Sequence, residues 1–452
     1  MMPPVGRRRL TAAVFIVGGV LLFSAPAAAS PVEVFGFGSR YAARAGAGTA
    51  LADDFAAVYY NPAGLALATG KHVTFGVQGA VSNLSVDERR ISLSDSFGFV
   101  AGLTAPLPLG GAMTERIHIG LGMYLLPKTI AQVRAHFPDE PFYPWYDNRL
   151  QRIVILPGAA VRLTDTVRVG AAVNFLAGVE GGVRASEGST RALEARVDER
   201  IPSVLRLNAG LSWSPTESVR LGLAYRERFE VPFATASQTE VAGEPIDLDL
   251  RASGQFTPNQ VAGGVAWIGS QVAATADLTW ANWSEYPGPF VQVRSELPLV
   301  GPLAAQVPAV PYQDTVAIRV ALESRGRLAV RGGYGFETSP IPAEQTGVTN
   351  LLDGPKHTVG AGLAVRFPDA IGGKELRIDL HLQAQIVAGR TLTKTIWNGD
   401  GDYNSFSSLR DEVTDNPTDP ATQGAQISNP GYPGLESGGE VYSGGLTMEV
   451  AL

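Results

Sequence analysis

The chain has 452 residues, a formal net charge of −7 at pH 7 and no cysteine. The acidic balance argues against a nucleic-acid partner, which needs a basic face. The lack of cysteine excludes disulfides, thiolate catalysis and cysteine-based metal sites. The 52 glycines together with a mean hydropathy of +0.07 suit many strands joined by tight turns.

The first 29 residues have the layout of a secretory signal peptide. Arg7, Arg8 and Arg9 precede an apolar run over residues 10–23, and small residues end at Ala29. This pattern predicts export with cleavage after Ala29. The alternative is a retained N-terminal anchor, but the apolar run is short for a membrane span. No later run of eighteen apolar residues occurs, so helical membrane spans are not expected.

Residues 30–70 differ from the rest of the chain because they are rich in Ala and Gly. Asp is a common helix N-cap, so a short helical turn is expected near Asp53 and Asp54. Asn61-Pro62-Ala63-Gly64 predicts a turn. So short a stretch of small residues cannot form a domain alone, but it could fold inside a barrel lumen.

Strict alternation of apolar and polar residues is the main signal in residues 71–452. In residues 376–386 every even position is apolar and every odd position is polar or charged. Such alternation places one face of a strand in hydrocarbon and the other in water. The same pattern recurs in residues 272–280, 359–367 and 442–452.

The connections alternate in length. Short turns are expected near residues 164–165, 214–216, 269–270, 324–326 and 372–373. Long polar or Pro-rich loops are expected at residues 132–149, 181–200, 236–253, 286–308, 339–356 and 393–440. This asymmetry is typical of bacterial outer-membrane barrels. It predicts an all-β fold, a transmembrane antiparallel β-barrel of about 14 strands whose lumen is wide enough for a plug. A soluble β-sandwich shows the same alternation and is the alternative.

Several side chains are candidates for contact with a substrate. The aromatic stretch with Phe137, Phe142, Tyr143, Trp145 and Tyr146 is either an apolar capture surface or an interfacial girdle. Trp213, Tyr225, Trp267 and Trp280 are expected to face lipid or the girdle.

Mid-strand charges form a second group. An Arg facing lipid at the midplane would cost about 2–4 kcal/mol, so these charges are expected to face the lumen. There they either contact a ligand and the plug or pair with one another. They are Asp277, Arg319, Arg331, Arg377, Asp379 and His381.

The acidic loop with Asp400, Asp402 and Asn404 is a weak calcium candidate. Its spacing matches part of a calcium loop, but Ser405 stands where Gly is required and Asp411 replaces the bidentate Glu. A solvated acidic loop is the alternative, and no metal or other cofactor is expected.

Separated motifs resemble the FadL family of outer-membrane transport proteins for long-chain fatty acids and hydrocarbons. The resemblance covers the mature chain in order. The matching stretches are residues 38–42, 50–54 and 60–64, then 283–286, 330–334 and 339–342. The chain departs from the family in two ways. It ends in Leu452, whereas outer-membrane barrels usually end in an aromatic residue. In addition, the basic residues that hold the ligand's carboxylate in the family cannot be aligned with residues of this chain.

The resemblance implies a multi-pass protein of the bacterial outer membrane with an N-terminal hatch inside a fourteen-stranded barrel. The domains would be the signal peptide (1–29), the hatch (30–70) and the barrel (71–452). Extracellular loops would capture a hydrophobic molecule, most readily a long-chain fatty acid, and movement of the hatch would let it diffuse through. Asp53, Asp54, Asn61, Pro62, Ala63 and Gly64 would belong to this hatch.

The expected partners are the hydrophobic substrate and outer-membrane lipid, with the protein acting as a monomer. Arg319, Arg331 and Arg377 are the candidate substrate-binding cations. The alternatives are a general porin, a structural or adhesive barrel, and an enzyme. The five scattered histidines form no recognisable nucleophile–base motif.

Overall fold

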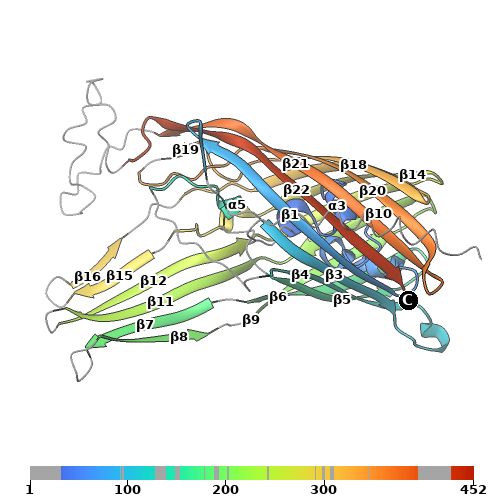
Figure 1. Ribbon diagram of the computed structural model, residues 1–452, viewed down its shortest axis with the longest axis horizontal. Helices are drawn as coiled ribbons and strands as arrows, with labels where there is room; N and C mark the ends of the chain where they lie inside the picture. Colours follow the sequence, from blue (N-terminus) through green and yellow to red (C-terminus); the bar gives the residue numbers. More distant parts are fainter. Residues whose placement is uncertain are drawn as a thin grey trace, which may run out of the picture.

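Fourteen antiparallel strands form a closed barrel (Figure 1). The structure, a computed structural model, describes residues 32–91, 93, 96–127, 139–147, 153–177, 179–187, 193–200, 203–241, 244–290, 292–297, 301–305, 310–345, 347–394 and 429–452. The expected signal peptide, Phe137 and the calcium candidates lie outside these residues.

Each barrel strand pairs with its sequence neighbours in the barrel, and the last strand pairs with the first, which closes the sheet. The sheet has sixteen strands, of which the two-residue strands β2 (Arg89–Arg90) and β19 (Glu344–Gln345) are appended to it. The fourteen barrel strands are β1 (His72–Val86), β3 (Ser96–Pro106), β4 (Ile117–Leu125), β5 (Val154–Arg162), β6 (Val167–Ala177), β9 (Ser203–Trp213), β10 (Val219–Arg226), β13 (Gln260–Ile268), β14 (Val272–Ala281), β17 (Thr315–Ser324), β18 (Leu328–Glu337), β20 (Lys356–Ile371), β21 (Lys374–Lys394) and β22 (Gly434–Ala451).

The alternation in the sequence is the alternation between the two faces of the barrel wall. On β21, Leu380 and Leu382 are 43% and 74% exposed, whereas Asp379 and His381 are 1% and 3% exposed. Closure pairs the backbone polar groups around the wall, which hydrocarbon requires. The outward leucines therefore form a lipid-facing surface, and the inward polar residues line the lumen.

The expected turns all join consecutive barrel strands at one end of the barrel, called here the short-turn end. Three of the long connections at the other end, the long-loop end, carry regular structure that the sequence analysis did not predict. They contain strands of a second, six-stranded sheet that projects from the barrel (Figure 1). Its strands are β7 (Val179–Glu187), β8 (Leu193–Arg200), β11 (Phe229–Val241), β12 (Glu244–Thr257), β15 (Gln292–Leu297) and β16 (Gly301–Ala305).

Pairing between different connections explains why this second sheet was not expected. Strand β11 pairs in parallel with β7, and β12 pairs with β15. These partners are far apart in the sequence, so no local pattern reveals them.

Residues 32–70, called here the lumenal segment, lie inside the ring of barrel strands (Figure 1). The segment consists of short helical turns: α2 (Val32–Phe35), α3 (Ser39–Ala42), α4 (Ala57–Tyr60) and η1 (Pro62–Leu67). The turn expected near Asp53 is present, and Asp54 accepts a hydrogen bond from the Ala56 backbone N–H at 2.9 Å. The other short helices within the described residues are η2 (Gly111–Met113), α5 (Pro144–Asp147) and η3 (Trp283–Glu285).

The barrel wall approaches the lumenal segment closely where the wall has glycines. A Cβ on Gly210 of β9 would lie 2.0 Å from the Asn61 Oδ1 atom. A Cβ on Gly360 of β20 would lie 2.6 Å from the Ala42 carbonyl oxygen on the opposite side. The segment is therefore packed against the wall on both sides. Within the described residues, no helix has the length and apolar character needed to cross a bilayer.

Candidate functional site

A cavity of about 100 Å³ lies between the lumenal segment and the long-loop end of the barrel. One part of its lining is aromatic, with Phe35, Tyr59, Tyr60, Trp145, Tyr146 and Trp283. The other part is polar and comes mainly from inward positions of the barrel strands, with Arg226, Gln260, Asp277, Arg319, Glu337, Lys356, Gln383 and Gln385. The cavity thus offers both apolar contact area and hydrogen-bonding groups.

The aromatic residues of the long-loop end form one packed cluster above the cavity. Trp145 of α5 stacks at a tilt on Trp283 of η3, with ring centroids 3.9 Å apart. Phe256 of β12 stacks on Tyr286 at 4.9 Å. Aromatic pairs with favourable geometry add about 0.5–1.5 kcal/mol per pair beyond area burial. The cluster fixes the loops over the mouth of the lumen.

The aromatic stretch around residue 145 is buried rather than spread over the surface. Phe142, Tyr143, Trp145 and Tyr146 are at most 3% exposed. The Tyr143 hydroxyl donates to the Ser85 carbonyl at 2.9 Å, and burial raises the pKa of Tyr143 to about 12. Trp145 and Tyr146 reach the cavity. The four residues that were predicted to face lipid or the girdle are 39–52% exposed on the outer face. They are Trp213, Tyr225, Trp267 and Trp280.

Two of the three cavity cations have an acidic partner. Arg319 lies 3.2 Å from Glu337, and Lys356 lies 3.0 Å from Asp353. The pKa of Asp353 is nevertheless raised, because its burial outweighs the neighbouring Lys356. These two pairs are largely neutralised before any ligand binds.

Arg226 is the third cation, and it has no carboxylate within 4 Å among the described residues. Its Nε and Nη2 atoms donate to Gln260 Oε1 at 2.9 and 2.7 Å. Its Nη1 atom donates to the Tyr59 carbonyl at 3.3 Å, and its guanidinium lies 4.9 Å from the Tyr59 ring centroid. The direct contacts of Arg226 are therefore all with neutral acceptors and an aromatic ring, although Glu33, Asp277 and Glu337 line the same cavity.

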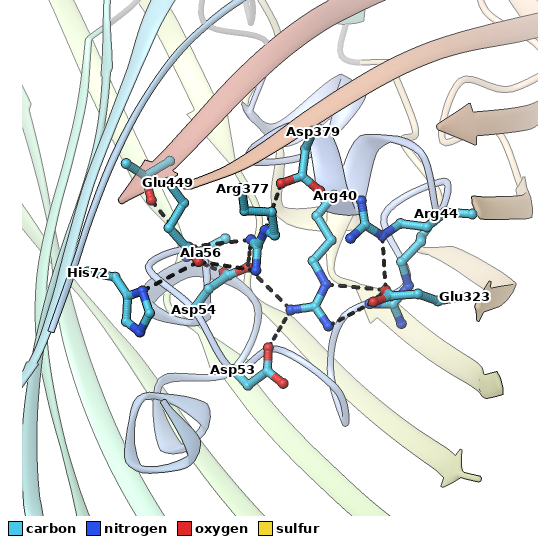
Figure 2. Close-up of polar contacts among 12 residues, drawn as sticks. Arg40, Arg44, Asp53, Asp54, Ala56, His72, Glu323, Arg377, Asp379 and Glu449 are labelled. Carbon is cyan, nitrogen blue, oxygen red and sulfur yellow. Dashed lines mark hydrogen bonds and ion pairs between the residues drawn. The ribbon is translucent and has the colours of Figure 1, made fainter. Parts of the chain in front are cut away.

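An ionic network joins the lumenal segment to the barrel at the short-turn end (Figure 2). Arg40 binds Asp53 and forms two 3.2 Å contacts with Glu323 of β17. Arg377 of β21 lies 2.8 Å from Asp379 and 3.1 Å from Glu449 of β22. Arg331 of β18 contacts both Glu323 and Asp379, which connects the two halves of the network.

Hydrogen bonds to the segment backbone complete this attachment. Asp277 of β14 accepts from the N–H groups of Gly48 and Thr49, both at 2.8 Å. Asn61 donates to the Thr49 carbonyl at 2.8 Å and to the Leu211 carbonyl of β9 at 3.0 Å. Asn61 also accepts from the Ala63 N–H at 3.2 Å, so it forms the turn before η1 and ties that turn to the wall.

The structure separates the three arginines that the sequence marked as substrate candidates. Arg319 lines the cavity, whereas Arg331 and Arg377 lie in the ionic network at the other end of the segment. Sequence reasoning missed Arg226 and Glu323. Both stand near the ends of alternating strands, but their importance depends on partners far away in the chain. Among the described residues, no group of three or more potential ligands is placed to hold a metal ion.

The comparison with protein families decides the identity of this barrel. The model of the outer membrane protein transport protein family (OMPP1/FadL/TodX) matches residues 20–382. The chain belongs to this family. Members of the FadL family are transport channels rather than enzymes, and this chain is an outer-membrane transporter for hydrophobic molecules.

Individual relatives of this FadL-family chain are distant in sequence. The alkane uptake protein A of Marinobacter nauticus is 22% identical over 392 residues, covering 78% of this chain and 85% of that protein. The solved structure of a Pseudomonas aeruginosa FadL homologue has a TM-score of 0.56 at 13% identity, covering 92% of this chain and 97% of that one. The toluene transporter TodX of P. putida has a TM-score of 0.56 at 16% identity, covering 93% and 99%. These two structures support the barrel fold.

Proposed function

We propose that this transporter takes up long-chain fatty acids, whose carboxylate binds Arg226 in the lumenal cavity. The observation that carries the proposal is that Arg226 has no acidic partner among the described residues, whereas Arg319 and Lys356 each have one. A carboxylate beside a guanidinium can form two parallel charge-assisted hydrogen bonds. Gln260, a neutral acceptor, occupies that position now and can be displaced without breaking an ion pair.

The aromatic wall supplies the complementary surface for the hydrocarbon chain. Trp145, Trp283 and Phe35 line the cavity on the side of the loops and the segment. Burial of a hydrocarbon contributes about 0.8 kcal/mol per CH₂ group. Burial of apolar surface against this wall thus supplies most of the binding free energy of the hydrocarbon chain. Arg226 sets the orientation of the fatty acid by binding its carboxylate.

A neutral hydrocarbon is the second candidate substrate. A cavity of about 100 Å³ is about two-thirds of the roughly 150 Å³ of an engineered apolar cavity that binds benzene. Two of the relatives are named for alkane uptake and for toluene transport. A small hydrocarbon would need the cavity to widen only slightly, whereas a long acyl chain needs the loops or the segment to move.

The lumenal segment is proposed to act as the hatch of this transporter. Asp53 and Asp54 connect it to the ionic network, and the turn formed by Asn61 and Pro62 connects it to β9. Ala63 and Gly64 pack in the same turn, where a Cβ on Gly64 would lie 2.0 Å from the Ala52 carbonyl oxygen. A substrate in the cavity reaches the periplasmic end only when some of these contacts break.

Uptake measurements with three labelled substrates test the role of Arg226. Oleate, hexadecane and toluene are supplied to cells that depend on this protein for uptake. Arg226→Gln is expected to raise the apparent KM for oleate at least tenfold and to leave hexadecane and toluene uptake unchanged. The matched control is Arg228→Gln, because Arg228 is exposed and pairs with Glu285 outside the cavity. Unchanged oleate uptake in the Arg226 variant would refute the carboxylate site.

The wild-type profile of the same assay separates the functional classes. Uptake of hexadecane or toluene without oleate would assign a neutral hydrocarbon as substrate. Free passage of small sugars through reconstituted barrels, with no uptake of any of the three, would assign a general porin. Retention of all transport in a variant without the segment would contradict the hatch. Passage of none of the probes, sugars included, would favour a structural or adhesive barrel.

A further inference from the structure

The charges at the periplasmic end of the barrel are distributed unevenly. Bacterial outer-membrane barrels place their short turns in the periplasm, so the short-turn end is the periplasmic end. On the side of β17 to β22, the ionic network pairs each of its own arginines, which are at most 12% exposed, with an acid. The side of β5 to β10 carries three arginines, called here the arginine row: Arg162, Arg168 and Arg220.

The strand register places the arginine row on the inner face of the wall. Arg168 of β6 is two residues from Gly170, whose Cβ would lie 2.4 Å from the Pro62 carbonyl carbon of the segment. Arg162 of β5 pairs directly with Arg168, so both side chains share that face. Arg220 of β10 is two residues from Gly222, whose Cβ would lie 2.2 Å from the Thr49 carbonyl oxygen.

Within the part of the chain that the structure describes, the arginine row has no carboxylate within 4 Å. The nearest carboxylate of the segment that acts on Arg220 is Asp53, and it binds Arg40 instead. Arg168 donates from Nη1 to the Ser214 hydroxyl at 3.2 Å and from Nη2 to the Asp165 carbonyl at 3.0 Å. Both of these partners are neutral groups. Asp165 and Asp53 act on Arg168 and Arg220 only at longer range, and Asp53 is already paired with Arg40.

Buried donors in the row also lack partners. The Nε atom of Arg168 and the Nε and Nη1 atoms of Arg220 are inaccessible to solvent and make no hydrogen bond among the described residues. The buried Ser212 hydroxyl, on the strand between them, is also without a partner. Buried donors without acceptors cost about 1–3 kcal/mol each, and like charges directly across a strand pair are destabilising.

We infer that the arginine row is a binding site for an oxyanion, a carboxylate or a phosphate group, that is reached from the periplasm. An oxyanion accepts hydrogen bonds from several guanidinium groups at once and neutralises their charge. Its source is either the head of a fatty acid that leaves the barrel or a free phosphate of the periplasm. Arg220 and Arg226 stand at opposite ends of β10, and the arginine row does not line the cavity that Arg226 lines, so the site is separate from the proposed uptake cavity.

Calorimetric titration of the full chain in a non-ionic detergent tests this site. The probes are inorganic phosphate and octanoate, each at low salt, where exposed charges are least screened. The wild type is expected to bind at least one of them, and the variant with both Arg168→Gln and Arg220→Gln is expected to bind it at least tenfold more weakly. Binding of both probes indicates a general oxyanion site, and binding of octanoate alone indicates the departing carboxylate.

Two controls locate the signal. Arg366→Gln removes an exposed arginine at the same end of the barrel and is expected to leave the affinity unchanged. Arg226→Gln removes the proposed uptake site. Octanoate binding that persists in this variant and is lost in the Arg168/Arg220 double variant belongs to the arginine row, and it stands even if the proposed function fails. Arg220→Lys, which keeps the charge, is expected to lose only part of the affinity. It preserves the test if the double variant does not fold, as judged by heat-modifiable gel mobility.

Two outcomes would overturn the inference. One is the absence of binding by either probe to folded wild type. The other is equal affinity in the wild type and in the folded double variant.

Discussion

Arg40 of the lumenal segment and Glu323 of β17 form a two-pronged ion pair across 283 residues of sequence. The Nε and Nη2 atoms of Arg40 each lie 3.2 Å from a different carboxylate oxygen of Glu323. The Glu323 side chain is 9% exposed and also contacts Arg331 and Arg44. One wall carboxylate thus holds the segment through two of its arginines.

Glu323→Gln is expected to loosen the segment, because it leaves buried guanidinium groups without their counter-charge. Breaking a buried pair from one side typically costs about 3–5 kcal/mol. Hydrogen exchange of residues 32–70 should speed up, and ion conductance through reconstituted barrels should rise. Glu285→Gln is the control, because Glu285 and its partner Arg228 are about half exposed, and such pairs contribute about 0–1 kcal/mol. Equal exchange in the two variants would show that Glu323 does not hold the segment.

Docking of the segment is expected to depend on pH through Asp54. Burial raises the pKa of Asp54 to about 6, and the opposing effects of Arg40 and Arg377 do not offset it. Glu449 and Asp53 also face this carboxyl and raise its pKa further. Because the docked pKa lies above the undocked value, this group favours docking most at low pH, and the contribution is lost as pH rises from about 4 through 6.

Hydrogen exchange of the segment measures this dependence once it is corrected for intrinsic rates. The corrected exchange rate should be lower at pH 5 than at pH 7.5. The difference should correspond to about 1 kcal/mol more docking free energy at pH 5. Asp54→Asn should remove the difference, because asparagine does not titrate and its side-chain oxygen can still accept from the Ala56 N–H. If the Asp54→Asn variant keeps the pH dependence of the wild type, another titrating group causes that dependence.

Gly210→Ala is expected to displace the turn formed by Asn61 and Pro62. The new Cβ would lie 2.0 Å from Asn61 Oδ1, and overpacking of this kind costs about 1–3 kcal/mol. Uptake should become leaky to small solutes. Gly263→Ala on β13 is the matched control, because a Cβ there meets nothing within 4 Å. If the two variants leak equally, close packing at β9 does not seal the lumen.

Leu382→Arg is expected to impair membrane insertion. Leu382 is 74% exposed on the outer face of β21, and an Arg that faces lipid costs about 2–4 kcal/mol near the midplane. The folded fraction in lipid vesicles should fall, as measured by gel mobility without heating. Leu452→Arg at the chain end, where the bilayer interface tolerates charge, should fold normally. Normal folding of both would place Leu382 outside the hydrocarbon region.

Local patterns in the sequence were sufficient to predict the barrel. The alternation over residues 376–386 sets which side chains of β21 face lipid, because the side-chain period of a strand is two whatever its partners are. The short turns near residues 214 and 372 were also predictable, because the residues that favour a turn lie within the turn itself. The six-stranded outer sheet was not, because β7 and β11 pair across about fifty residues of sequence.

The sequence by itself determined the wall, the lipid-facing surface and the presence of a separate N-terminal segment. Only the tertiary structure decided which charges are free. Arg331 and Arg226 look alike along the chain, yet Arg331 contacts Glu323 and Asp379 while Arg226 contacts only neutral acceptors. The reason is that a charge is neutralised by its neighbours in space, and closing the barrel around the segment brings together residues hundreds of positions apart.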